Sequence, residues 1–181
     1  MKRVIGLLGV FFLIAVAVQA HDIVLRKEGK AQLGVSYPTD WKQVVGENHV
    51  TAVSADGQAW SVISTLEGIA DKKAGAAKIK EGLEDYLKDI KYDELAETKS
   101  GSLIVSGVGK GKKTGVDVVF TTAVFDSGEG QLCGLVFIID ASIEKYYEKT
   151  VLAICKSILV EQDFADEEKD VATKKGERID Q

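Results

Sequence analysis

The sequence predicts an α+β domain in which a mainly antiparallel β-sheet is flanked by two long helices. Three observations support this fold class. Segments with strand-like alternation are joined by short turns, as in antiparallel hairpins. Two other segments repeat their apolar residues at intervals of three and four, as amphipathic helices do. Residues 132–139 are apolar on both faces, which predicts a central strand covered on both sides.

The first half of the chain predicts three strands followed by a helix. Residues 32–37 alternate, and residues 49–55 and 59–66 flank Asp56-Gly57, a strong two-residue hairpin signal. Asp71 is the expected N-cap of the helix, because its carboxylate can accept a hydrogen bond from a free N–H of the first turn. The apolar stripe of this helix consists of Ala76, Ile79, Leu83, Tyr86 and Ile90.

The second half predicts three further strands and a second helix. The strands are expected at residues 103–107, 116–125 and 132–139, with glycine-containing turns between them. Asp140 or Ser142 is the expected cap of the helix that follows. The apolar stripe of this helix consists of Ile143, Tyr147, Val151, Ile154 and Ile158.

Residues 1–20 have the features of a cleavable secretory signal peptide. Lys2 and Arg3 precede an uncharged apolar run at residues 4–18, and Val18-Gln19-Ala20 places small residues at the cleavage site. The apolar run is shorter than the roughly 20 residues that a membrane-spanning helix needs. We therefore expect a periplasmic or secreted protein that starts at His21 and is not stably inserted in a membrane.

The remaining chain reads as one domain with two extensions. Residues 21–31 form a lead-in, residues 32–160 the domain, and residues 161–181 a charged tail that we expect to be disordered. Without the signal, 21 basic residues stand against 28 acidic ones, a formal net charge of −7. This balance argues against nucleic acid and anionic membranes as partners, and leaves an envelope protein or a small ligand.

Two segments resemble PsbP-like domains, a group that includes DcrB-like periplasmic domains. One is the strand and turn Gly34-Val35-Ser36-Tyr37-Pro38-Thr39-Asp40-Trp41, and the other is the last helix and its exit, residues 144–158. The resemblance covers residues 32–159. It implies an α/β/α sandwich with a central antiparallel sheet, and it supplies no shared catalytic motif.

The sequence contains no motif that commits it to a reaction. Lys112 stands where a phosphate loop beginning at Gly107 would need a glycine, and neither histidine lies in a nucleophile motif. The main hypothesis is therefore a non-catalytic exported accessory or binding protein without a cofactor. Tyr37 and Trp41 are its candidate ligand-binding residues.

Two alternatives stay open. In the first, the protein is a copper-binding exported enzyme, in which the amino group and imidazole of His21 hold copper with His49 as a further nitrogen ligand. In the second, it is a structural or stress-related envelope protein with no small-molecule site.

Cys133 and Cys155 are the only cysteines, and an oxidising compartment permits a disulfide between them. Cys133 lies about 23 Å back along its strand from Asp140, at about 3.3 Å per residue. Cys155 has returned about 20 Å along the last helix, at about 1.5 Å per residue. The sequence thus predicts a bridge that fastens the last helix to the sheet, provided that Cys133 faces this helix. The pattern does not decide which face it occupies, and two buried free thiols are the alternative.

Overall fold

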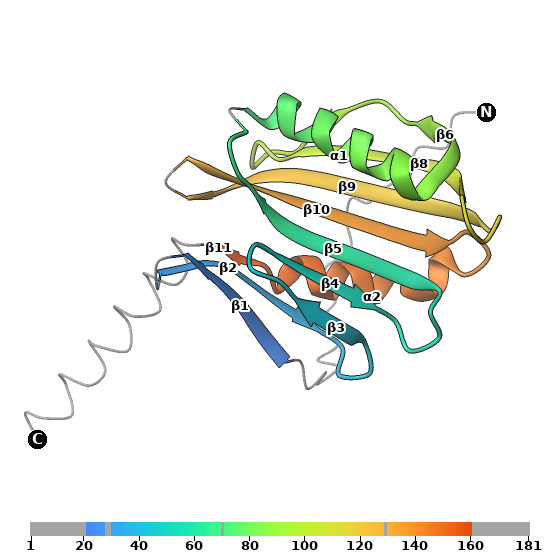
Figure 1. Ribbon diagram of the computed structural model, residues 1–181, viewed down its shortest axis with the longest axis horizontal. Coiled ribbons are helices and arrows are strands. Elements are labelled where there is room, and N and C mark those ends of the chain that lie inside the picture. The colour runs from blue at the N-terminus through green and yellow to red at the C-terminus, as the bar shows by residue number, and fades with distance from the viewer. Residues whose placement is uncertain (1–20, 28–29, 70, 129, 161–181) are drawn as a thin grey trace, which may run out of the picture.

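A computed structural model describes residues 21–27, 30–69, 71–128 and 130–160 of the chain (Figure 1). The predicted signal peptide, residues 1–20, and the predicted tail, residues 161–181, lie outside the described residues. The strands are β1 (His21–Lys27), β2 (Lys30–Tyr37), β3 (Lys42–Val45), β4 (His49–Val53), β5 (Ala59–Leu66), β6 (Leu87–Tyr92), β7 (Ala96–Glu97), β8 (Leu103–Gly111), β9 (Asp117–Gly128), β10 (Gln131–Asp140) and β11 (Leu159–Val160). The helices are α1 (Lys72–Tyr86) and α2 (Glu144–Lys156).

The main sheet has the strand order β3-β4-β5-β10-β9-β8-β6, with β7 paired to β8 beside this path. All of its pairings in the described residues are antiparallel. The strand predicted to be central is β10, which lies between β5 and β9 and is buried along most of its length. The α+β class and the mainly antiparallel sheet are therefore confirmed.

The two faces of the main sheet are covered differently. Helix α1 packs on β6, β8, β9 and β10 on one face, and we call this the α1 face (Figure 1). The opposite face carries α2 and a small sheet of order β1-β2-β11, and the buried residues between these layers form the largest core cluster. The segment predicted to be a lead-in, residues 21–31, thus contains β1, which pairs with β2.

The helices are shorter than the sequence predicted. Helix α1 has 15 residues and α2 has 13. Asp71 caps α1 as expected, because its side chain accepts a hydrogen bond of 2.8 Å from the Ala74 N–H. The helix ends at Tyr86, however, because Leu87 is extended and begins β6. The prediction that Ile90 belongs to the helical stripe is therefore wrong, and Ile90 lies in a strand.

The predicted cap of α2 is also wrong. The N-cap position is Ile143, which makes no side-chain capping hydrogen bond. Asp140 instead fixes the turn before the helix, where its carboxylate accepts hydrogen bonds from the Ser142 N–H at 2.8 Å and from the Ser142 hydroxyl at 2.7 Å. Both predicted residues therefore act together before the helix, Asp140 three residues and Ser142 one residue ahead of the N-cap position. No helix among the described residues combines the length and the apolar character needed to cross a bilayer.

The predicted disulfide is not formed, and both cysteines are free thiols. Cys133 does face α2, since it is fully buried in the same core cluster as Tyr147 and Ile154. Cys155 is exposed, because α2 turns Ile154 toward the sheet and successive residues of a helix point about 100° apart. The spacing of the apolar stripe placed Cys155 near the buried side of the helix. Because Cys155 follows Ile154 by one residue, its side chain points away from the sheet and does not reach Cys133.

Candidate functional site

The structure places the two predicted ligand-binding residues in the core. Tyr37 has 0% of its surface exposed and Trp41 has 5%. Their rings stack with centroids 5.9 Å apart, and Tyr147 of α2 meets the Trp41 ring edge-on at the same separation. The Tyr37 hydroxyl accepts a hydrogen bond of 3.0 Å from Ser61, and burial raises the pKa of this phenol to about 12. Tyr37 and Trp41 therefore pack in the core and help to hold α2 on the sheet.

A groove opens instead on the α1 face, between the helix and the strands that it does not cover. Its volume is about 290 Å³, close to the lower limit of small-molecule sites. We call it the α1 groove. Its floor is formed by His49 and Thr51 of β4, Trp60, Val62 and Ser64 of β5, and Gly134 and Val136 of β10, and its wall by Ile79, Gly82, Leu83 and Tyr86 of α1.

Strand register creates the floor of the α1 groove. Side chains of a strand alternate between the two faces of a sheet, and directly paired residues share a face. His49 pairs with Ser64, which in turn pairs with Gly134, and this row forms one end of the floor. Thr51, Val62 and Val136 form the next row in the same way. The pairing thus places the hydroxyl and imidazole groups of two strands side by side.

Two glycines shape the space between α1 and the sheet. A Cβ on Gly134 would lie 2.9 Å from the Ile79 Cδ1, so this glycine allows the helix to approach β10 closely. A Cβ on Gly82 would meet no atom within 4 Å, so this position of α1 faces open space in the groove. The first glycine closes the bottom of the groove and the second keeps its wall open.

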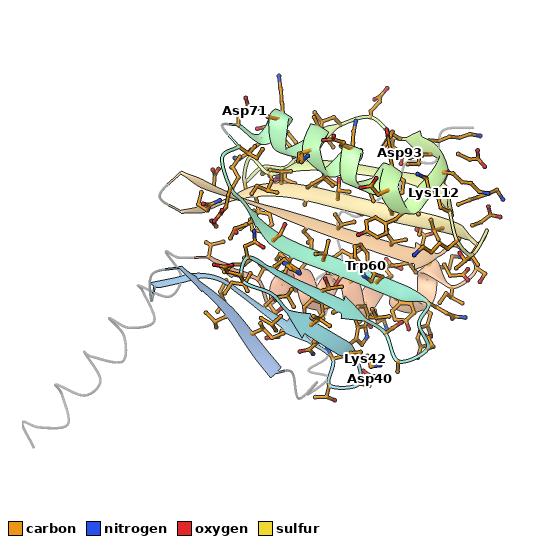
Figure 2. All side chains as sticks on the ribbon, viewed as in Figure 1. Asp40, Lys42, Trp60, Asp71, Asp93 and Lys112 are labelled. Atoms are coloured by element: carbon orange, nitrogen blue, oxygen red, sulfur yellow. The ribbon has the colours of Figure 1, made fainter. Side chains whose placement is uncertain are left out.

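The two ends of the groove differ chemically. At one end the His49 Nδ1 lies 3.2 Å from the Asn48 Oδ1, and the hydroxyls of Thr51 and Ser64 have no hydrogen-bond partner among the described residues. At the other end the rings of Trp60 and Tyr86 pack against each other with centroids 5.9 Å apart. Figure 2 labels Trp60 on β5.

Sequence reasoning identified one residue of this groove, His49, but for a different role. His49 lines the groove on the α1 face, whereas β1, which begins with His21, packs Ile23 and Leu25 into the core on the opposite face. The side chain of His21 lies outside the described residues. Among the described residues there is no group of three or more metal-ligating side chains. The copper site formed by His21 and His49 therefore stays a prediction.

Solved structures with a similar fold include LpqN from Mycobacterium tuberculosis, described as involved in cell envelope biogenesis, and a cyanobacterial PsbP (CyanoP) from Synechocystis sp. PCC 6803. The LpqN structure is 15% identical with a TM-score of 0.48, and the match covers 79% of this chain and 91% of that one. The CyanoP structure is 13% identical with a TM-score of 0.49, and the match covers 86% and 99% of the two chains.

A PsbP structure is among the structures that this chain resembles. The similarity concerns the arrangement of strands and helices, and it carries no conclusion about function. No protein-family model matches the chain, and no curated protein sequence matches it.

Proposed function

We propose that this protein is a non-catalytic exported binding protein of the cell envelope, and that the α1 groove is its binding site. The observation that carries the proposal is the groove itself, which combines an apolar floor with a few convergent polar groups. This combination is typical of small-molecule sites. Export rests on the signal-like residues 1–20, and N-terminal sequencing of the native protein should find His21 first.

The lining of the α1 groove supports binding more than catalysis. His49 and Ser64 are neighbours across two strands, but no hydrogen bond joins them, and the imidazole contacts Asn48 instead. A nucleophile and its general base need a hydrogen bond of about 2.6–3.2 Å. None of the residues that line the groove in the described part of the chain is an acid, a lysine or a cysteine.

The proposal is tested by closing the groove. In the Gly82→Phe variant a ring would project from α1 into the groove, and the backbone has room for it because a Cβ there meets nothing within 4 Å. The matched control is Ala77→Phe, which places the same ring on an exposed position of α1 outside the groove lining. Each protein is isolated from the native envelope under mild conditions, and its bound small molecules are extracted and identified by mass spectrometry.

We expect a molecule that accompanies the wild-type protein and the Ala77→Phe control and is absent from Gly82→Phe. Equal melting temperatures would show that the loss comes from the groove and not from unfolding. If Gly82→Phe retains the same bound molecules as the control, the α1 groove is not the binding site. If neither the wild type nor the control carries any small molecule, the accessory role must use another surface and the proposal fails.

A further inference from the structure

The α1 groove has a polar end and an apolar end, separated along one strand. Ser64 lies at the polar end and Trp60 at the apolar end, both on β5 and both on the α1 face. Four residues of strand separate them, which corresponds to about 13 Å at about 3.3 Å per residue. A ligand that fits this groove lengthwise must itself have two chemically different ends.

The polar end offers hydrogen-bond donors. The hydroxyls of Thr51 and Ser64 lack partners among the described residues, and so does one ring nitrogen of His49, whose Nδ1 lies by Asn48. A hydroxyl can donate one hydrogen bond, whereas the Nε2 of a neutral imidazole whose Nδ1–H faces the Asn48 oxygen is an acceptor. The two hydroxyls can therefore converge on one acceptor group of a ligand.

The charges of the lining decide between possible head groups. A cationic head group would find no carboxylate to pair with, because no acid lines the groove in the described part of the chain. A carboxylate is acceptor-only and can take several hydrogen bonds at once, and such charge-assisted bonds are about twice as strong as neutral ones. The lining thus favours a carboxylate head group over an ammonium group. It also favours a carboxylate over a hydroxyl head group, because charge-assisted hydrogen bonds are stronger than neutral ones.

The remaining lining selects the body of the ligand. Val62 and Val136 form the middle of the floor, Leu83 forms the wall above them, and the packed rings of Trp60 and Tyr86 close the far end. This surface offers mainly dispersion contacts, although the Tyr86 hydroxyl and the Trp60 indole N–H at its far end also lack hydrogen-bond partners among the described residues. It suits an apolar body that reaches no more than about 13 Å from the head group, by the strand spacing given above.

We infer that the ligand of the α1 groove is a small amphipathic carboxylate. Its carboxylate accepts hydrogen bonds from Thr51 and Ser64, and its apolar body lies over Val62 and Val136 toward Trp60. This inference rests on the proposed function, and it adds the chemical class of the ligand and its orientation in the groove.

The test uses three probes with one apolar body and different head groups: octanoate, 1-octanol and octylamine. Binding to the full mature protein is followed by NMR chemical-shift changes and by the fluorescence of Trp60. We expect octanoate to bind about tenfold more tightly than 1-octanol, with octylamine weakest. Removal of the two hydroxyls in Thr51→Val/Ser64→Ala should weaken octanoate about tenfold and leave 1-octanol nearly unchanged.

The matched control is Thr121→Val, which removes a hydroxyl that contacts Ser106 outside the groove. It should change none of the three affinities. Equal binding of all three probes, or an unchanged octanoate affinity in the double variant, would overturn the carboxylate inference while groove binding itself stands. If none of the probes binds, the carboxylate inference falls as well, and the Gly82→Phe experiment decides separately whether the groove holds any ligand.

Discussion

The two tryptophans should respond in opposite ways to replacement by alanine, because one is a core residue and the other lines the α1 groove. Trp41 is 5% exposed and contacts the rings of Tyr37 and Tyr147. Replacing a buried aromatic residue with alanine costs about 3–5 kcal/mol, through lost burial and the cavity left behind. This is a large part of the roughly 5–15 kcal/mol by which domains are stable.

The Trp60→Ala variant should cost less, because the Trp60 side chain is only half-buried and lies at the edge of a groove. We expect a loss of about 1–2 kcal/mol, in proportion to the smaller apolar area removed from water. Ligand binding should change in the reverse order. Trp60→Ala should weaken it several-fold, while Trp41→Ala should leave it unchanged as long as the protein is folded.

Urea unfolding followed by circular dichroism measures both losses. With a slope of about 2 kcal/mol per M, a loss of about 4 kcal/mol in Trp41→Ala lowers the midpoint by about 2 M. If this variant does not fold, Trp41→Phe keeps one ring and should lose about 1–2 kcal/mol. A loss below 1 kcal/mol in Trp41→Ala, or weakened binding in folded Trp41→Phe, would show that Trp41 belongs to the binding site after all.

Three further results are expected. In the folded protein Cys155 should react with a thiol reagent because its side chain is exposed, while Cys133 should react only after unfolding because its side chain is fully buried; no reactive thiol at all would contradict the structure. Gly107→Ala should cost several kcal/mol in urea unfolding, because a Cβ there would overlap a β6 carbonyl oxygen and a buried phenylalanine ring. The hydrogen bond from Ser54 lowers the pKa of Asp56, so this carboxylate stabilises the fold above its unfolded pKa of about 3.9, and the contribution is lost as the pH falls through the folded pKa. The Asp56→Asn variant should therefore show a smaller fall of the melting temperature at acid pH than the wild type. An equal fall in both proteins would refute this.

Local signals in the sequence predicted much of the sheet. Asp56-Gly57 forms the turn between β4 and β5, and Gly57 has the positive φ of 72° that this turn favours. The strand apolar on both faces is central because both of its faces are covered. Asp71 caps α1 through the hydrogen bond expected of an N-cap. Each of these features depends on residues close together in the chain.

The features that escaped prediction depend on contacts between distant segments. Ile90 continues the helical spacing of α1, but the chain has already become extended at Leu87 to pair with β8. Strand β3 has only four residues, too few for a clear alternation, and it forms by pairing with β4. Trp41 and Trp60 both occur where strands and turns meet, and the sequence does not reveal which of them a helix covers. The groove was missed for the same reason.

The groove follows from a mismatch of widths. A helix is about 10 Å across, and neighbouring strands are about 4.8 Å apart, so one helix covers two to three strands of a sheet. The path of the main sheet contains seven strands, and α1 is the one helix packed on this face in the described part of the chain, on the side of β6, β8, β9 and β10. The α1 faces of β3, β4 and β5 are therefore left without a covering helix, as Figure 1 shows.

An uncovered sheet face can be made compatible with water by polar residues, and antiparallel sheets commonly alternate in this way. Thr51 and Ser64 follow that rule, but Trp60 and Val62 lie on the same face and do not. Exposure to water gives no reason for the polar residues to gather at one end of β5 and the aromatic residue at the other. A ligand with a polar and an apolar end does give such a reason, because each end then meets groups of its own kind and the ligand covers the apolar surface that α1 is too narrow to reach.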